Sequence, residues 1–291
     1  MTQPISSDRL SDDRTDEDHE IRSVWNLYLI IGALLILFYL ILAIFGDYLA
    51  PYGYNDQDLM NPLAPPSWEH PFGTDPIGRD LLSRIIIGTR YTLWVAIISV
   101  LLATVGGVAL GLLSGFLGGR VDAVITTIVD LFLTIPLLIL AIAIASVAGA
   151  GMTGLIVATS ISFTPPLARL IRGRVLEIRE EEFIQAAFAI GVRTPRILLR
   201  HLLPNTLTVI FIQSSLFAGR AILVATALGF LGLGVRPPIP EWGTLLGGGR
   251  EYLEMAPHLV VAPGFAISLL VLAFNLLGDG LRDHFDPRAK I

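Results

Sequence analysis

The chain of 291 residues contains no cysteine, and its single lysine, Lys290, is next to last. The missing cysteines exclude disulfides, thiolate metal sites and cysteine nucleophiles. The phosphate-binding loop Gly-x-x-x-x-Gly-Lys-Ser/Thr is also missing, so the chain does not bind and hydrolyse ATP by that route. Any energy from ATP has to come from a partner.

Histidine is scarce as well: the five histidines stand singly, without a His-Glu-x-x-His pattern and without a clustered Ser/His/Asp set. We therefore predict neither a metal site nor a hydrolase site in this chain. A membrane enzyme is a further alternative, and the absence of these patterns argues against it.

Charged residues make up only 15% of the chain and hydrophobic residues 53%, with a mean hydropathy of +0.69. Soluble domains carry about 25% charged residues, so this composition predicts an integral membrane protein. The net charge of −5 belongs to the first 20 residues, which hold seven acids and two arginines. The neutral remainder excludes a basic nucleic-acid-binding domain as the main function. We expect residues 1–22 to form a disordered, acidic cytoplasmic tail.

Six nearly uncharged stretches reach the length of about 20 apolar residues that a helical span needs. They lie at 24–46, within 91–119, from about 124 to the turn at 149–154, from that turn to 168, at 206–232 and at 257–278. The first has no basic segment before it and no cleavage site, which indicates an uncleaved anchor. We predict an all-α membrane protein with a first span and outer loop at 23–90, a five-helix core at 91–280 and a cytoplasmic tail at 281–291.

Arginine is distributed unevenly around these spans. With both termini in the cytosol, fourteen basic residues fall on the inner side and five in outer loops. The positive-inside rule favours this orientation. On the outer side Arg79, Arg84 and Arg90 form a basic run, which we expect to pair with Asp75 and Asp80 or to lie at the level of the lipid headgroups.

The inner segment 169–205 is long and rich in charge for so apolar a chain. Leu176, Phe183, Ala187 and Ile190 are spaced as one apolar helix face. Gly191 then interrupts the pattern. Two short helices joined at a glycine indicate a docking element on the cytosolic side; a connector lying on the membrane surface is the alternative.

The second of these helices has its own start signal. Thr194 and Pro195 predict an N-cap followed by proline in the first turn. We expect this helix to run to Leu203 and to end before Pro204.

The same loop resembles the EAA signature of the permease subunits of ABC importers, which reads Glu-Ala-Ala, three residues, Gly, nine residues, Ile, one residue, Leu-Pro. The matching residues are Gln185, Ala186, Ala187, Gly191, Leu203 and Pro204. Gln185 stands where the signature has Glu and His201 where it has Ile, while Glu181 and Glu182 are close enough to supply the lost charge. The resemblance implies coupling helices that seat in a cleft of an ATP-hydrolysing subunit.

Three further segments, at 70–84, 230–243 and 275–288, resemble the C-type permeases of dipeptide, oligopeptide and nickel importers, so the likeness covers roughly residues 22–290. It implies the six-helix, MetI-like fold of type I importers in a bacterial or archaeal cytoplasmic membrane. It also implies a second homologous permease, two cytoplasmic ATPase subunits that hold ATP and Mg, and an external solute-binding protein. No cofactor is expected on this chain itself.

We therefore predict the permease subunit of an ATP-driven peptide importer. One alternative is an importer of nickel or another small solute in the same family. A secondary transporter with Asp130 and Arg220 as a relay is a further alternative, which predicts an inverted repeat that the sequence does not show.

Asp130 and Arg220 are the charges inside the predicted spans, and such residues are functional candidates by default. Their depths differ by about 13 Å at 1.5 Å per residue, too far for a pair. We expect Arg220 to face a polar cavity near the pathway and Asp130 to pair with a loop arginine at the cytosolic interface. Pro136 predicts a kink in its span, near the pathway or merely tolerated.

Glycines at 107, 111, 115 and 119 repeat every fourth residue and predict close helix contact, either within this subunit or at a face that slides. The outer segment 234–257 carries Trp242 and Tyr252 among Pro and Gly. It is expected to contact an external binding protein or to be a solvated connector.

Overall fold

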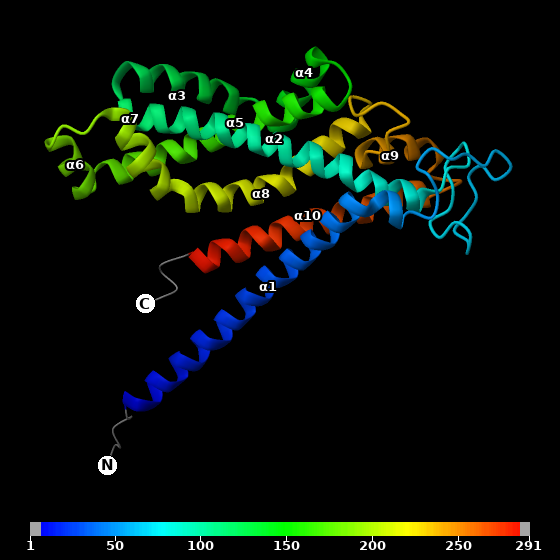
Figure 1. Cartoon of the computed structure of the whole chain (residues 1–291), viewed down its shortest axis with the longest axis horizontal. Coiled ribbons are helices and arrows are strands. Elements are labelled where there is room, and N and C mark those ends of the chain that lie inside the picture. The colour runs from blue at the N-terminus through cyan, green and yellow to red at the C-terminus, as the bar shows by residue number, and fades with distance from the viewer. Residues whose placement is uncertain (1–6, 286–291) are drawn as a thin grey trace.

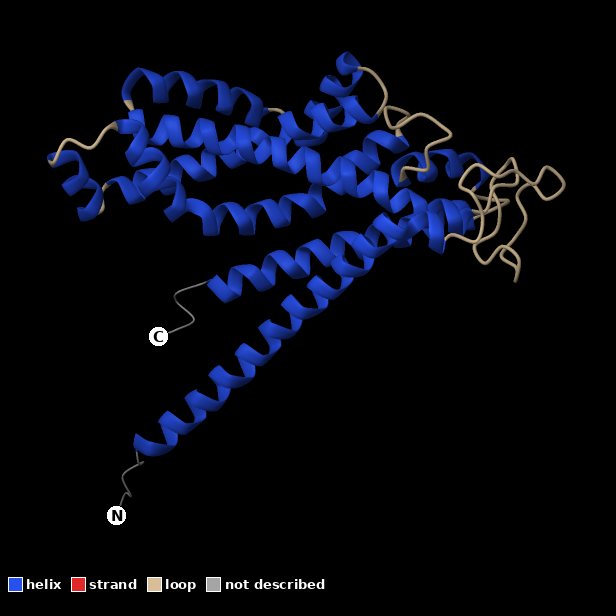
Figure 2. Ribbon diagram, in the orientation of Figure 1, coloured by secondary structure: helices blue, strands red, loops and turns tan. Residues whose placement is uncertain are grey.

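The structure, a computed structural model, describes residues 7–285, with side chains from Leu27 onward. In this part of the chain the regular elements are helices, with one isolated bridge between Thr74 and Asp80 (Figures 1 and 2). The helices are α1 (Ser7–Leu49), α2 (Leu81–Leu117), α3 (Gly119–Thr134), α4 (Leu137–Ala148), α5 (Met152–Arg179), α6 (Glu182–Ala189), α7 (Thr194–Ile197), the π-turn η1 (Leu198–Leu202), α8 (Leu203–Phe230), α9 (Trp242–Gly249), the 3-10 turn η2 (Arg250–Tyr252) and α10 (His258–Phe285). The all-α prediction is confirmed.

Five stretches of helix in the described part of the chain are long and apolar enough to cross a membrane. They are α1, α2, α5, α10 and the continuous helix formed by α7, η1 and α8. The sixth span is the pair α3 and α4, which bends by 97° at a short break. The six predicted spans are thus five continuous helices and one broken pair.

The break between α3 and α4 lies at Pro136 and is larger than the expected kink. A residue before proline is pushed out of the helical region, and Ile135 accordingly has an extended backbone with ψ 128°. Pro136 is also extended, with ψ 132°, and precedes the first turn of α4. Pro136 therefore separates two helices.

The core of the fold is the contact between α2 and α5, and the glycine repeat forms it. A Cβ atom added at Gly107 would lie 2.8 Å from Cβ of Leu167, and one at Gly111 would lie 2.7 Å from Cβ of Ile171. At Gly119 nothing lies within 4 Å, so the repeat ends before its fourth member. The structure supports the packing interpretation within this subunit.

α2 begins at Leu81, ahead of the span expected from Tyr91, because Asp80 caps it: its carboxylate accepts a hydrogen bond from the backbone N–H of Ser83 at 2.7 Å. Arg90 therefore lies inside the helix. Its guanidinium is 2.9 Å from the carboxylate of Asp47 at the end of α1.

The rest of the outer basic run pairs with Asp75. Arg79 lies 2.7 Å from its carboxylate and Arg84 3.7 Å. The expected pairing is thus correct for Asp75. It is wrong for Asp80, whose carboxylate contacts His70 at 2.9 Å and Ser83 in the helix cap.

α1 extends back to Ser7, into the segment for which we expected disorder; residues 1–6 lie outside the described part of the chain. Neither proline nor glycine occurs between residues 5 and 31, so this stretch contains no residue type that breaks a helix. Similarly, α10 carries the expected C-terminal tail as helix to Phe285, and residues 286–291 are not described.

The outer segment 234–257 is largely folded into the protein and is not a solvated connector. Trp242 is fully buried, and its indole N–H donates to the backbone oxygen of Ile85 at 3.0 Å. Glu241, 1% exposed, caps α9 by accepting from the backbone N–H groups of Gly243 and Thr244, both at 2.9 Å. A buried tryptophan and a buried cap thus fix this segment against α2.

Candidate functional site

The candidate coupling loop was predicted at residues 169–204, but α5 continues as a helix to Arg179, so the loop that lies at one end of the molecule consists of residues 180–204. α5 leads into it, α6 projects from it, and α7 leads back through η1 into α8 (Figure 1). The loop is therefore mostly helical, as expected, and it lies at the opposite end from the outer loop that joins α1 to α2.

The first junction of the loop is the turn between α5 and α6 at Glu180 and Glu181. The side-chain amide of Gln185 donates to the backbone oxygen of Arg179 at 3.0 Å, which closes this turn. Glu182 lies in the first turn of α6, where a negative charge is favourable. Gln185 thus has a local structural role that the sequence alone did not suggest.

α6 buries a different face from the predicted one. Ile184 and Ala187 are buried, whereas Phe183 is 45% and Ile190 80% exposed. The prediction is confirmed for Ala187 and wrong for Phe183 and Ile190, because it continued one helical register across the turn at 180–181, where the chain changes direction. Phe188 holds α6 to α2 by stacking on Phe116, with ring centroids 5.5 Å apart.

Gly191 ends α6 in a two-bond helix cap. Its N–H donates to the backbone oxygen of Phe188 and the N–H of Val192 donates to that of Ala187, both at 3.0 Å. This cap needs a left-handed residue, and Gly191 has φ +74°. No atom lies within 4 Å of the position of an added Cβ, so backbone conformation and not space requires glycine here.

The second helix of the loop differs from the expected short one. It begins after Arg193, so the cap lies one residue before Thr194, and it continues without a break to Phe230. Pro204 interrupts the hydrogen bonding but not the helix. It has no N–H, and the preceding turn widens so that the N–H of Leu203 bonds to the oxygen of Leu198. The second helix of the coupling loop is thus continuous with the span that follows.

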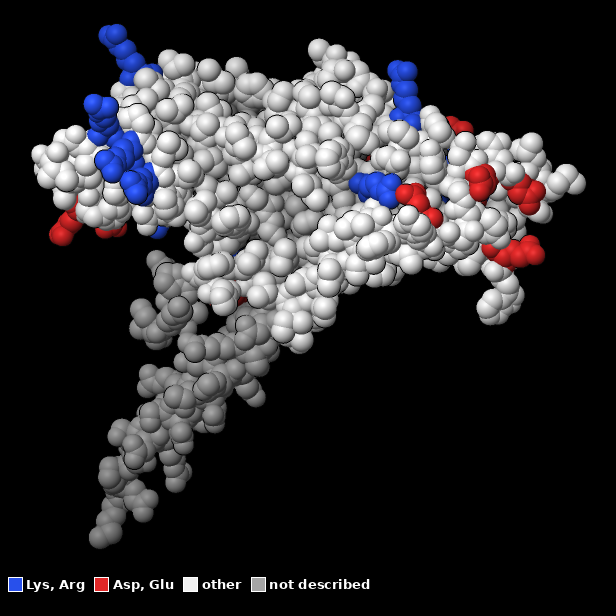
Figure 3. Space-filling model, in the orientation of Figure 1, with Lys and Arg blue, Asp and Glu red and all other residues white. Residues whose placement is uncertain are grey.

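His201 and Leu203 are half-buried in this continuous helix, and Ile197 and Leu202 are fully buried beside them. Glu181, Glu182, Gln185 and Ala186 are exposed. In Figure 3, basic side chains gather over the end that carries α7, with acidic ones beside them near α6. The surface of the loop therefore presents charges of both signs around the exposed rings and aliphatic chains of α6.

The remaining candidate residues lie apart from this loop. Arg220 is exposed on α8, and none of the ion pairs found among the described residues includes it. Asp130 on α3 forms an ion pair with Arg169 on α5. Pro136, at the break, lies between Asp130 and the start of α4.

A second pair on the same two helices was missed by sequence reasoning. The carboxylate of Asp122 accepts from Nε and a terminal nitrogen of Arg172 at 2.6 and 2.7 Å, and from the hydroxyl of Ser114 at 2.5 Å. The signal was present: acids eight residues apart on one helix and arginines three apart on another share a face. What the sequence did not reveal is that these helices are neighbours.

The chain matches two known families of transport proteins. Residues 107–291 match the family described as the binding-protein-dependent transport system inner membrane component. Residues 28–66 match the N-terminal transmembrane domain of oligopeptide transport permease C.

Relatives match over nearly the whole chain. The dipeptide transport system permease protein DppC of Alkalihalophilus pseudofirmus is 44% identical over 265 residues, which cover 91% of this chain and 87% of the relative. The glutathione transport system permease protein GsiD of Pectobacterium atrosepticum is 41% identical over 277 residues, 92% and 91% of the two chains. The di/tripeptide transport system permease protein DppC of Pseudomonas aeruginosa is 41% identical over 265 residues, 89% and 88% of the two chains.

Among solved structures, the MetNI methionine ABC transporter in an inward-facing conformation matches with a TM-score of 0.58 and 21% identity. The match covers 71% of this chain and 98% of the matched chain. At this identity the likeness concerns the fold alone, and it agrees with the predicted MetI-like architecture.

Proposed function

Since the chain belongs to the family of binding-protein-dependent transport system inner membrane components, we propose that it is the permease subunit through which an ATP-driven importer takes up short peptides. The relatives named for dipeptide, di/tripeptide and glutathione transport support a peptide as the substrate. Glutathione is itself a small peptide, so these names share one substrate class.

The observation that carries the coupling role is the construction of the loop at 180–204. α6 is held by the stack of Phe188 on Phe116 and by the cap at Gly191, and it presents an exposed outer face. On its far side the loop continues as one helix into α8. A push or pull on this second helix therefore reaches a membrane span without passing through a non-helical joint.

The working cycle follows from this helical connection. Two cytoplasmic ATPase subunits bind ATP with Mg and close, drawing the coupling loops of this chain and of a second homologous permease together. Because packed helices move as rigid bodies, this motion reorients the spans. An external solute-binding protein delivers the peptide to the outer side. The chain contributes the pathway and the coupling surface, and its partners contribute hydrolysis.

In the cell we place this multi-pass protein in the bacterial or archaeal cytoplasmic membrane, with both termini in the cytosol. Glu181 and Glu182 are the exposed acids nearest to Gln185, and we assign them the ionic contact that the family's glutamate supplies to the ATPase. Arg220 and Pro136 are assigned to the pathway side of the chain.

The test is reconstitution of the complete importer in lipid vesicles with its binding protein. We expect labelled dialanine to accumulate only with ATP and binding protein present, and peptide-loaded binding protein to stimulate hydrolysis. Uptake that follows a proton gradient in the absence of the ATPases would contradict the proposal. Uptake of a nickel complex but not of dialanine would contradict the proposed substrate class and would still support an ATP-driven importer.

A further inference from the structure

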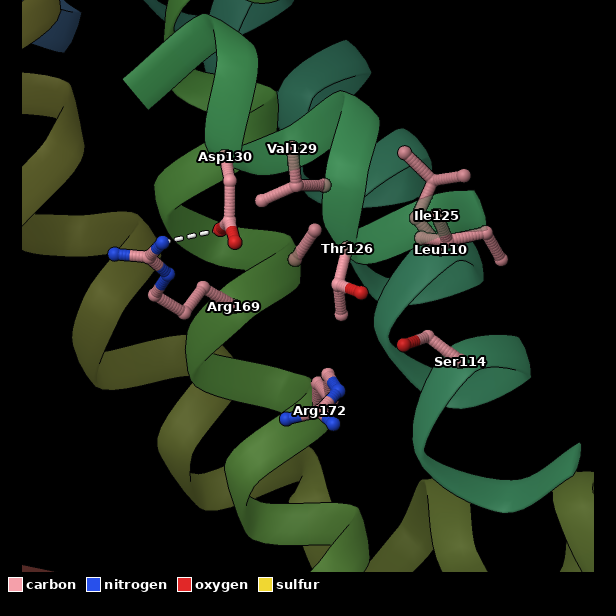
Figure 4. Close-up of a pocket in the computed structure, with 9 residues that line it drawn as sticks. Leu110, Ser114, Ile125, Thr126, Val129, Asp130, Arg169 and Arg172 are labelled. Atoms are coloured by element: carbon pink, nitrogen blue, oxygen red, sulfur yellow. Dashed lines mark hydrogen bonds and ion pairs between the residues drawn. The ribbon is translucent and has the colours of Figure 1, made fainter. Parts of the chain in front are cut away.

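A cavity of about 390 Å³ lies between α2, α3 and α5, away from the coupling loop surface (Figure 4). Its polar lining consists of Asp130, Arg169, Arg172, Thr126 and Ser114. The volume is in the range of small-molecule sites, which are about 300–1,000 Å³. Charges of both signs therefore line a space large enough for a small ligand.

The two ion pairs at this cavity differ in how firmly they are held. The side chains of Arg172 and Asp122 are 32% and 20% exposed, and Ser114 adds a hydrogen bond to the carboxylate. Those of Arg169 and Asp130 are 60% and 57% exposed. Exposed pairs contribute only about 0–1 kcal/mol, so the Asp130–Arg169 pair opens at little cost while the deeper pair stays closed.

The exposed pair also lies well inside its two helices and not at their ends. Asp130 is eleven residues from the start of α3 and Arg169 ten from the end of α5. At 1.5 Å per residue both are about 15 Å from the inner ends of their helices, so they lie within the apolar helices and away from the cytosolic turns. Ionisable groups within membrane spans face a bundle interior or a water-filled space.

The lipid side of the chain lies elsewhere. α1 is the most apolar span and is little buried within the protein, and Figure 1 places α1 and α10 on the opposite side of α5 from α3. We therefore infer that the face of α3 and α5 with the cavity borders an aqueous pathway.

We propose that this cavity binds a short peptide by its free termini, the α-ammonium group at Asp130 and the α-carboxylate at Arg169. The proposal rests on the proposed function and adds the residues that contact the substrate. A zwitterion replaces the exposed ion pair charge for charge. A ligand with only one charge forms one of these two ionic contacts and leaves the other group without a charged partner, so it gains less than a zwitterion does. Arg172, fixed by Asp122, keeps the floor of the cavity in place.

The natural absence of cysteine makes the test direct. In the reconstituted importer, with its other subunits free of cysteine, Thr126→Cys places one thiol in the cavity. Thr127→Cys places the matched control at the next residue, which is exposed but is not part of the cavity lining. Each variant is treated with a charged, water-soluble thiol reagent without nucleotide, and modification of this chain is followed by mass.

We expect the thiol at 126 to react, and dialanine to slow its reaction at least threefold. N-acetyl-alanine amide, which lacks both charges, should not slow it, and the reaction at 127 should not respond to either compound. Adding Asp130→Asn or Arg169→Gln to the Thr126→Cys variant should abolish the protection and leave the reaction itself intact.

Three results would overturn this inference: no reaction at 126, which means that the partner permease or lipid seals the cavity; equal protection by the blocked peptide; or equal protection at 127. Uptake of dialanine by the unaltered importer is measured in parallel. Uptake without protection overturns only the binding site, whereas absence of ATP-driven peptide uptake overturns the proposed function itself.

Discussion

At the scale of single residues, Gly191 and Gly173 allow the effect of backbone conformation on a substitution to be measured apart from the effect of steric crowding. An added Cβ meets nothing within 4 Å at either position, but only Gly191 has a positive φ, +74°. Alanine in the left-handed region costs about 1–2 kcal/mol, whereas alanine within a helix is favoured over glycine by about 0.5–1 kcal/mol. We expect Gly191→Ala to loosen the end of α6 and Gly173→Ala, in α5, to be neutral or stabilising.

The measurement is peptide transported per ATP hydrolysed in vesicles. Gly191→Ala should lower this ratio severalfold while the chain still inserts, and Gly173→Ala should leave it unchanged. Gly191→Asn should fall between them, because asparagine enters the left-handed region more readily than alanine. An unchanged ratio of peptide transported to ATP hydrolysed in Gly191→Ala would show that the helix cap at Gly191 is not needed for coupling.

Glu241 gives the outer end a dependence on pH. Burial raises the pKa of its carboxyl above the ordinary value of 4.5, although three hydrogen bonds from Gly243 and Thr244 oppose the shift. The folded state therefore holds the proton more tightly than the unfolded chain. The stabilisation that results is complete below the unfolded pKa and is lost as the pH rises through the folded pKa.

We expect Glu241→Gln to remove this dependence, because glutamine does not ionise. The melting temperature of the purified chain, measured from pH 4 upward, should fall with rising pH in the unaltered protein relative to the variant. A constant difference between the two curves would contradict the shift and leave Glu241 as a helix cap only.

At the scale of elements, the contact between α2 and α5 depends on the absence of side chains. A Cβ at Gly111 would lie 2.7 Å from Cβ of Ile171 and 2.8 Å from the backbone oxygen of Ala168, whereas one at Gly106 would meet only Thr164, at 3.3 Å. Overpacking costs about 1–3 kcal/mol. Gly111→Ala should therefore lower the melting temperature clearly, and Gly106→Ala much less. Equal shifts would mean that α2 and α5 separate easily.

The same glycines show how much of each element the sequence could predict. Their spacing indicates a close helix contact, but spacing names no partner, and only the fold identifies α5. The broken pair shows a similar limit. Pro136 predicts a bend, but the size of the bend depends on how α3 and α4 pack. α9 was missed because its glycines resemble a loop, and Trp242 becomes a buried anchor only beside Ile85.

The candidate site was predicted in position and not in detail. The signature residues located the coupling loop and the end of α6 at Gly191. The prediction of the buried face of α6 was wrong for Phe183 and Ile190, because the turn at 180–181 changes the helical register. No single residue in that turn indicates the change in the sequence. The Asp122–Arg172 pair was missed because it joins residues 50 positions apart.

At the scale of the whole molecule, the two ends differ in charge, and this asymmetry predicts the orientation in the membrane. In Figure 3 basic side chains gather at the end that carries α7, and most of the acidic ones on this face lie at the opposite end. Since positive charge is retained on the cytosolic side, the end with the coupling loop should face the cytosol.

Single cysteines test this orientation without removing any native thiol. Trp68→Cys lies in the outer loop, where Trp68 is fully exposed, and Arg120→Cys lies in the first turn of α3, where Arg120 is exposed. In intact cells whose outer layers admit small molecules, a membrane-impermeant thiol reagent should label position 68 and not 120. After the cytoplasmic membrane is opened, both should react. Labelling of position 120 in intact cells would show that the orientation is opposite to the expected one. The coupling loop would then face away from any cytosolic ATPase.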